Sequence, residues 1–559
     1  MLRALGSRQT SMAAAATLVL LFAGCTNPCE YVRNGFKVGP NYCPVAAPVA
    51  NNWIDAADVR IRSQCDDISQ WWNVFNDPVL NNLIAYAYRQ NLTVKQAAFR
   101  VLQARYQLAI TKGEFFPQLQ NASGSYSRFG STPGGFFNQW NFNFNLQWEL
   151  DFWGRLRRAI QQADDQVGAS VADYDDVMVT LLSDVASNYV QIRTDQELIK
   201  LLTENVQVQT SVYALTQTRL GVGTLAELDV QQAESTLKQT EAAIPLVLID
   251  MRQANDQLCT LLGIPPADLM CMLGNGSIPT APPEVALGIP CEMLRRRPDI
   301  RRAERTAAAQ AEQIGIAEAD LYPVFSIGGQ MDWSAGKFAN LFSTQAFNGN
   351  VGPSFNWKLL NYGRIVNNVH LQDANFQQLI AAYQNTVLVA NQEVEDGLVT
   401  FLQAQERTKI LNDSVKAGEI ARGIALHLYE TGPTGFDFNR YALIQQNLIT
   451  QQNAWASAQG QIAQGLISVY RALGGGWEIR LNPPPAPEIC MPVTPPPGVQ
   501  QPGVPVPGAV PMPEILPTPP NPTTNPYNAP QQLPPRPPDV STTFSNESSI
   551  SSMKSMPVV

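Results

Sequence analysis

Apolar and polar side chains alternate strictly along one segment in the first third of the chain. Phe142, Phe144 and Trp148 are among its apolar positions, and Asn, Gln and Glu residues occupy the positions between them. A period of two is typical of a β-strand with one apolar and one polar face. A later segment repeats the pattern in the same phase, with Phe355 and Trp357 on its apolar face. We predict that both segments are strands whose five aromatic residues face either membrane lipid or the core of a globular sheet sandwich. Four strands separated by helical stretches make one small sheet with exposed edges, which favours lipid.

The two alternating segments belong to an internal duplication. Five positions recur at a spacing of 209 residues: Trp148, Leu150, Gly154, Arg155 and Gly223 match Trp357, Leu359, Gly363, Arg364 and Gly432. Copies of this length far exceed solenoid repeats, so a whole unit was duplicated. Each copy is expected to hold a second strand, at residues 119–128 and 325–333. Pro353, inside the later segment, is expected near a strand end or a bulge because it cannot donate a ladder hydrogen bond.

Long helices are predicted after each strand pair. Apolar residues recur at steps of three and four over residues 174–192, and most of the matching positions over residues 383–401 are apolar too. That spacing indicates a helix with one buried face. A helix over residues 155–219 would be roughly 100 Å long, which no single globular core requires. A glycine-marked turn and a return helix follow in each copy, and Pro245 is expected to kink the first return helix.

The two ends of the chain differ from the rest. Residues 1–24 have the basic start, apolar core and small final residues of an export signal. The cysteine that follows resembles that of bacterial lipoproteins, so we predict lipid attachment at Cys25; a cleaved signal followed by an incidental cysteine is the alternative. No Asp follows Cys25, which favours the outer membrane. Beyond residue 480 the chain is rich in proline and is expected to be extended or disordered.

Composition restricts the chemistry that the chain can perform. A formal net charge of -9 argues against nucleic acid as a partner. With only 2 histidines and no CxxC pair, no metal site is expected. The carboxylates are dispersed and no glycine loop is suited to phosphate, so we predict no catalytic residues, no cofactor and no enzyme activity. Cys271 and Cys291 could form a disulfide, or they could be separate thiols.

These patterns divide the chain into six expected parts. They are a signal peptide (1–24), an N-terminal periplasmic or anchor segment (25–70), repeat 1 (71–263, with strands near 118–150 and a helix hairpin near 154–262), a linker (264–290), repeat 2 (291–480, with strands near 324–360 and a hairpin near 363–474) and a proline-rich tail (481–559).

Four strands in one chain raise a problem of closure. No apolar run after the signal reaches the roughly 20 residues of a spanning helix, so the chain would either be soluble after export or cross a membrane as strands. Open sheet edges in lipid leave backbone groups unpaired, at a cost of several kcal/mol each. The smallest transmembrane barrels have about eight strands, so one chain cannot close alone. A ring of identical chains can, and three chains would provide twelve strands.

Five short stretches point to a family. They are KVGPNY at residues 37–42, WWNVFNDP at 71–78, ELDFWGR at 149–155, RLGVG at 219–223 and LRRRPDIR at 294–301. They resemble the TolC-like outer membrane efflux proteins, specifically the NodT-type lipoprotein subgroup. The resemblance covers residues from about 36 to 479. It implies a mainly α fold with a membrane β-barrel, in which a homotrimer forms a twelve-stranded barrel continued by a helical periplasmic tunnel.

The resemblance also implies roles for the turns between the long helices. In the family these turns form the periplasmic tip that contacts the adaptor. The matching residues are Gly221, Val222, Gly223, Tyr429, Glu430, Thr431 and Gly432. Acidic residues at the tip narrow the pore in relatives; Asp229 fits that pattern in the first copy. In the second copy Tyr441 stands where the aspartate is expected, and Asp437 is a nearby substitute.

Taken together, the sequence predicts a lipid-anchored outer membrane channel, the exit duct of a tripartite efflux or type I secretion system. Its predicted partners are two further copies, a periplasmic adaptor, an inner-membrane pump and outer membrane lipid. The alternative is a structural lipoprotein whose long helices act as coiled-coil spacers in the cell envelope. The basic run at residues 295–297, followed by Asp299, is expected to organise a helix start instead of binding a ligand.

Overall fold

The computed structural model describes residues 28–62, 67–131, 133–286, 295–431 and 437–484. Its helices are α2 (Pro28–Arg33), α3 (Pro78–Gln90), α4 (Leu92–Gly113), α5 (Arg155–Gly221), α6 (Glu227–Leu261), α7 (Met270–Leu273), α9 (Pro298–Ala319), α10 (Arg364–Thr431) and α11 (Phe438–Ala472), with 3-10 turns η1 (Trp71–Phe75), η2 (Phe338–Asn340) and η3 (Trp477–Arg480). Its strands are β1 (Ile61–Arg62), β2 (Leu119–Ser131), β3 (Gly135–Leu150), β4 (Val285–Ala286), β5 (Val324–Ala335) and β6 (Phe347–Asn356).

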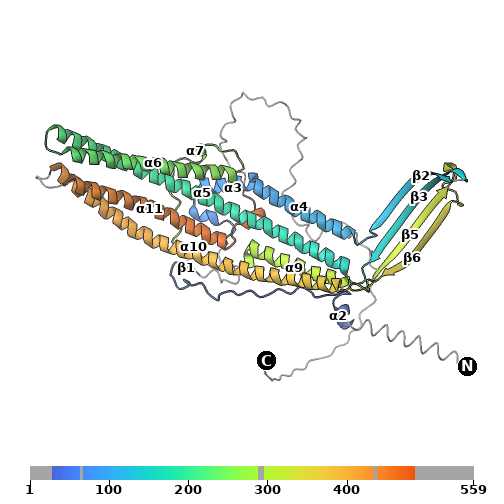
Figure 1. Ribbon diagram of the computed structural model, residues 1–559. Coiled ribbons are helices and arrows are strands. Elements are labelled where there is room, and N and C mark those ends of the chain that lie inside the picture. Colours follow the sequence, from blue (N-terminus) through green and yellow to red (C-terminus); the bar gives the residue numbers. More distant parts are fainter. Residues whose placement is uncertain (1–27, 63–66, 132, 287–294, 432–436, 485–559) are drawn as a thin grey trace, which may run out of the picture. The chain divides into compact units, whose positions relative to one another are not determined.

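The two predicted strand pairs form one antiparallel sheet in the order β2-β3-β5-β6 (Figure 1). The register sets Phe144 opposite Ala122 on β2 and opposite Met331 on β5. Alternation of side chains puts Phe142, Phe144 and Trp148 on the same face of β3, as predicted from the sequence. Among the described residues, no further strand pairs with the outer edges of β2 and β6. The prediction of a strand pair in each copy is confirmed.

The last strand is shorter than the sequence pattern predicts. Alternation continues to Leu359, but β6 ends at Asn356, so Trp357 is not a strand residue. The Trp357 indole Nε1 donates to Leu321 O at 2.9 Å, and Leu359 N bonds back to Trp357 O at 3.1 Å, which turns the backbone out of the ladder. Trp148 in the first copy makes the matching bond to Phe115 O at 3.2 Å. Both tryptophans therefore fasten the end of the sheet to the chain that enters it.

Pro353 lies within β6, opposite Ile327, and the register passes through it without a bulge. Proline has no N–H to donate, so β6 lacks one backbone donor at this position.

A side-chain cap determines where α3 begins. Asp77 accepts hydrogen bonds from Val79 N at 2.9 Å and Leu80 N at 3.3 Å, and Pro78 occupies the first turn of α3. An acceptor side chain before the helix and a proline at its first position are typical of helix starts. The motif at residues 71–78 therefore ends in the cap and first residue of α3.

Two long helix hairpins, α5–α6 and α10–α11, make up most of the fold and lie side by side in Figure 1. The apolar stripe predicted for the first is buried throughout: Tyr174, Met178, Leu181, Val185, Tyr189 and Ile192. Five of its six counterparts are buried as well: Val387, Ala390, Val394, Leu398 and Phe401. Pro245 lies inside the continuous helix α6.

A buried ion pair joins the start of α5 to α9 and to the N-terminal segment. Arg158, which is 0% exposed, donates to Glu312 Oε2 at 2.7 Å and to the carbonyls of Val38 and Gly39, each at 2.6 Å. Gly315 on α9 lies against this guanidinium, and a Cβ there would overlap with it. The residues 37–42 motif therefore contributes backbone acceptors to a charge that would otherwise be unpaired.

A second network joins the start of α9 to α5 and to the end of η3. Asp175 on α5 is fully buried and binds Arg301 at 2.9 Å and Arg480 at 2.6 Å. Arg297 donates to Ala472 O at 2.6 Å and to Asp299 at 2.7 Å. The prediction that the basic run organises a helix start is confirmed for Arg297.

The remaining predictions concern the cysteines and a membrane-spanning helix. Cys271 is a free thiol, and Cys291, its proposed partner, lies outside the described residues, as do Cys25 and Gly432. No helix in the described part of the chain is both long and apolar enough to cross a membrane.

Candidate functional site

The helix turn between α5 and α6 is built on glycine. Gly221, Val222 and Gly223 are exposed, and Gly223 has a φ of 75°. Gly223 N donates to Leu220 O at 2.9 Å and Thr224 N donates to Arg219 O at 3.0 Å, which closes the helix in the left-handed manner that favours glycine. Val222 is 70% exposed, so an apolar residue faces outward at the end of the hairpin.

Arg219 connects the ends of the two long helices. Its Nη1 donates to Tyr429 O at 2.6 Å and its Nη2 donates to Glu430 O at 2.7 Å, both in the last turn of α10. Its guanidinium carbon also lies 4.8 Å from the centre of the Tyr429 ring. The last carbonyls of a helix carry partial negative charge and have no partner within the helix. Arg219 therefore acts as the C-terminal cap of a helix in the other copy.

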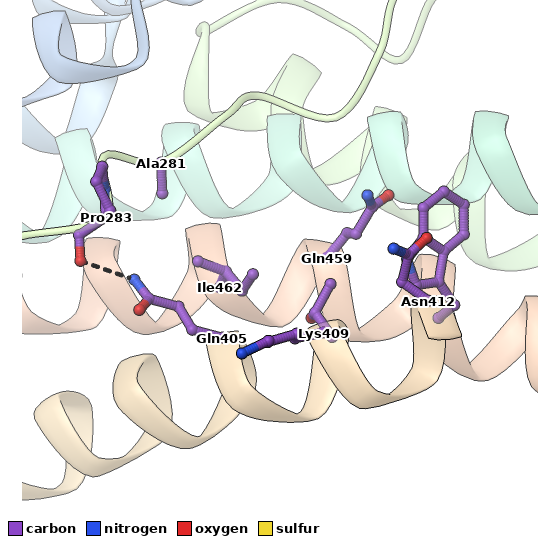
Figure 2. Close-up of a pocket in the computed structure, with 9 residues that line it drawn as sticks. Ala281, Pro283, Gln405, Lys409, Asn412, Gln459 and Ile462 are labelled. Carbon is purple, nitrogen blue, oxygen red and sulfur yellow. Dashed lines mark hydrogen bonds between the residues drawn. The ribbon is translucent and has the colours of Figure 1, made fainter. Parts of the chain in front are cut away.

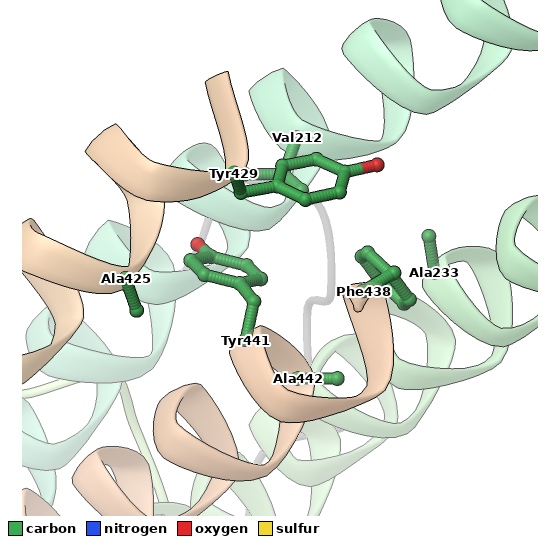
Figure 3. Packing of buried hydrophobic residues seen from close by; sticks show 7 residues of the cluster. All are labelled: Val212, Ala233, Ala425, Tyr429, Phe438, Tyr441 and Ala442. Atoms are coloured by element: carbon green, nitrogen blue, oxygen red, sulfur yellow. The ribbon is translucent and has the colours of Figure 1, made fainter. Parts of the chain in front are cut away.

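Behind this contact lies an apolar core that we call the tip cluster. It consists of Val212, Ala233, Ala425, Tyr429, Phe438, Tyr441 and Ala442 (Figure 3). Four helices, α5, α6, α10 and α11, contribute to it. The Tyr429 and Tyr441 rings stack with centroids 6.1 Å apart. Burial raises the pKa of the Tyr441 hydroxyl to about 12.

The acidic candidates occupy different settings. Asp229 is half-buried in the first turn of α6, where its negative charge suits the helix N-terminus. Asp437 is exposed and caps α11 by accepting from Asn439 N at 3.2 Å. Tyr441, which replaces the expected acid of the second copy, is only 2% exposed. That position is therefore part of the core, and Asp437 is the accessible carboxylate.

The structure places the described tip candidates of the two repeats next to each other. The last residues of α10 are Tyr429, Glu430 and Thr431. Arg219 links them to the turn at residues 221–223 by its hydrogen bonds to Tyr429 O and Glu430 O. Arg219 lies in the RLGVG motif of residues 219–223, but the motif alone does not identify it as a site residue. A basic residue in the last turn of a helix is a usable signal, yet it suggests capping of α5 itself, and α10 receives the bond instead.

Aromatic side chains also gather on the sheet. Phe142 lies 5.8 Å from Trp333, and Phe325 lies 6.4 Å from Phe355, measured between ring centroids. Phe355 is 69% exposed and Phe144 is partly exposed. In water such a surface would be unusual for a monomer. The remaining lipid-facing candidate, Trp357, lies beyond the strand, as described above.

An open groove of about 430 Å³ runs along α10 and α11 beneath an extended segment (Figure 2). Gln405 Nε2 donates to Pro283 O at 3.2 Å at one end of it. Apart from Lys409, the residues that line the groove are apolar, amide or hydroxyl side chains. Such a lining offers no pair of groups for acid–base chemistry. No group of three His, Cys, Asp or Glu side chains suited to a metal ion occurs in the described part of the chain.

Comparison with known proteins gives a consistent result. The family model described as outer membrane efflux protein matches residues 83–264 and 289–475. Nodulation protein T of Rhizobium leguminosarum bv. trifolii is 28% identical over 458 residues, covering 79% of this chain and 95% of the relative. The pyoverdine export outer membrane protein OpmQ of Pseudomonas putida is 28% identical over 435 residues, covering 73% and 88%.

Solved structures share the fold. The outer-membrane channel OprN superposes with a TM-score of 0.73 at 31% identity, covering 79% of this chain and 99% of OprN. CusC, whose structures concern folding and transmembrane channel formation, gives a TM-score of 0.69 at 23% identity, covering 78% and 100%.

Proposed function

This chain belongs to the outer membrane efflux protein family, and from that premise we propose that three copies form the exit duct of a tripartite efflux pump. The chain is an outer membrane efflux channel, a passive conduit and not an enzyme. A periplasmic adaptor and an inner-membrane pump would supply the substrate and the free energy. The main support for the trimer is the four-stranded sheet, because its outer strands, β2 and β6, have unpaired edges in the described chain.

The packing of the duplicated helices supports the same assembly. α9 packs against both α5 and α10, whereas α4, its counterpart in the first copy, packs against α5. One face of α4 carries exposed apolar residues at helical spacing: Leu92, Phe99, Tyr106 and Ile110. If α4 packed as α9 does, it would lie between α5 of its own chain and α10 of a neighbouring protomer. A closed ring of copies would cover that face.

The tip is proposed as the adaptor contact and the gate. Supporting this, Gly221, Val222 and Gly223 are exposed, and glycine lets a partner backbone approach closely. Asp229 and Asp437 are the proposed acidic residues of the constriction. The bonds of Arg219 to α10 would hold the two hairpins together in the closed state.

Lipid attachment at Cys25 is proposed as the membrane anchor. Its support is the sequence of the export signal. Two signals are needed for stable anchoring when a lipid chain is present; here the barrel would be the second. A Cys25→Ala variant is expected to lose metabolically incorporated palmitate while its strands still assemble.

A paired substitution on β3 tests the channel. Phe144→Arg would place a charge on the lipid face, at a cost of about 2–4 kcal/mol near the bilayer midplane, and should abolish insertion and conductance. Asn143→Arg, one residue away on the polar face, should leave a conducting trimer. Purified full-length protein is measured by planar-bilayer conductance and native mass spectrometry.

The scaffold alternative predicts a different pattern. A structural lipoprotein would show no conductance and no trimer, and the two arginine variants would behave alike. Either result would refute the proposed channel.

A further inference from the structure

A directed chain of buried amides runs between α5 and α11 next to the tip cluster. Asn205 Nδ2 donates to Gln452 Oε1 at 2.8 Å, and Gln445 Nε2 donates to Asn205 Oδ1 at 2.9 Å. These three residues are between 1% and 7% exposed, and Gln209 beside them is 5% exposed. Each bond fixes which end of the amide is the oxygen, so the Gln445 oxygen must point onward from the chain.

The chain of bonds stops at that oxygen. Gln445 Oε1 and both polar atoms of the Gln209 amide are buried without a hydrogen-bond partner among the described residues. A buried polar group left unsatisfied costs about 1–3 kcal/mol. Native proteins satisfy nearly all such groups, and ordered water is a common partner.

Gln209 and Gln445 both line a small cavity. It measures about 10 Å³ and lies between α5, α6 and α11. Gln209, Gln445 and Thr236 form its polar wall, and residues of the tip cluster shown in Figure 3 form its apolar wall. A space of about 10–15 Å³ with two to four polar partners suits one buried water molecule.

We propose that this cavity is a structural water site. The water accepts a hydrogen bond from Gln209 Nε2 and donates one to Gln445 Oε1. Its second hydrogen faces the Thr236 hydroxyl oxygen, which remains free to accept because Thr236 donates to Gln232 O at 2.9 Å. The bridge extends the amide chain from α11 back to α5 and across to α6. Its partners all belong to one chain, so the site does not depend on the assembly proposed above.

The sign of a stability change tests the proposal. Gln209→Met keeps the side chain's length and removes its polar atoms. With a bound water, the variant strands the water and lowers the thermal unfolding midpoint of the full-length protein by roughly 2–4 °C. In a dry cavity, Gln209 is an unsatisfied group whose removal raises the midpoint. Gln207→Met, at an exposed position of the same helix, is the matched control.

A crystal structure of the purified protein at about 2 Å gives the direct readout. Density within hydrogen-bond distance of the Gln209 and Gln445 amides is expected. A raised midpoint in Gln209→Met would overturn the proposal. Direct contact between the two amides, with no density between them, would overturn it as well.

Discussion

The two long helices α5 and α10 descend from the same unit, yet they are packed in opposite ways. α5 buries 25 of its 67 residues, whereas α10 buries 11 of its 68. Four of the buried residues in α5 are charged: Arg158, Asp175, Arg193 and Asp195. The positions 209 residues later hold Asn367, Gln384, Leu402 and Ala404. No charged residue is among the buried residues of α10.

After the duplication, the two helices have different packing partners. α5 contacts α3, α4, α6, α9 and α11, so its charges lie inside the chain and can be paired there. α10 contacts α9 and α11, and its outer face keeps exposed apolar residues such as Ile410, Ile420 and Ile424. Helix α5 therefore packs in the interior of one chain, whereas the outer face of α10 is suited to contact with another protomer.

The buried arginine is expected to show the contrast most strongly. Arg158→Ala would leave Glu312 buried without its partner and should lower the free energy of unfolding by about 3–5 kcal/mol. Arg364→Ala, in the exposed first turn of α10, should change it by less than about 0.5 kcal/mol. Denaturant titration of the purified variants measures both.

Replacing both partners refines this prediction. Arg158→Met combined with Glu312→Met should recover most of the loss, because no buried charge remains. Equal effects of the two single arginine substitutions would contradict the assignment of α5 as the interior helix.

A buried carboxyl should give α5 a pH dependence that α10 lacks. Burial raises the pKa of Asp195 to about 6, and the nearby Asp250 adds to the rise. The folded state therefore binds the proton more tightly than the unfolded state, whose Asp pKa is about 3.9. The free energy of unfolding should fall by roughly 2–3 kcal/mol as the pH rises from about 4 to about 6.

Asp195→Asn should remove most of this fall. The control is Asp396→Asn on α10, where an exposed carboxylate accepts from Gln392 four residues earlier, as Asp195 accepts from Gln191. Unfolding curves measured from pH 4 to 7 distinguish the two. An unchanged pH profile in Asp195→Asn would show that burial does not shift this carboxyl.

The smallest expected change in stability concerns the contact between the two repeats of one chain, which Arg219 makes with α10. Arg219→Ala removes two hydrogen bonds to α10 and should cost about 1–2 kcal/mol. If the tip is a gate, the channel should also spend more time open, as seen in single-channel recordings. Arg219→Lys keeps the charge but cannot form the paired bonds, so it should fall in between. Identical recordings for all three proteins would mean that Arg219 does not restrain the tip.

Much of the fold could be predicted because it depends on local patterns. The period of two at residues 142–150 specifies a strand whatever its neighbours are. The steps of three and four from Tyr174 specify a buried helix face, and the structure buries it. Trp357 shows the limit: its alternation continues past Asn356, but its bond to Leu321 ends the strand. That bond joins residues far apart in the chain, so the local pattern does not contain it.

The tip could be predicted less completely for the same reason. Glycine at residues 221 and 223 marks a turn in the sequence. The partner of Arg219 depends on the distance between two hairpins, which no spacing in the sequence fixes. Likewise Tyr441 departs from the family pattern, and only its packing shows that the position lies in the core.

The Arg158 site fixes α5 at one end only. The helix extends for roughly 100 Å from there to its turn, and it is held along that length by the Asp175 bonds to Arg301 and Arg480 and by the Arg219 bonds to α10. A tilt of about 5° about Arg158 would sweep the far end through roughly 9 Å, given that length. Such a displacement would break the Arg219 bonds, so α5 cannot tilt this far unless the last turn of α10 moves with it.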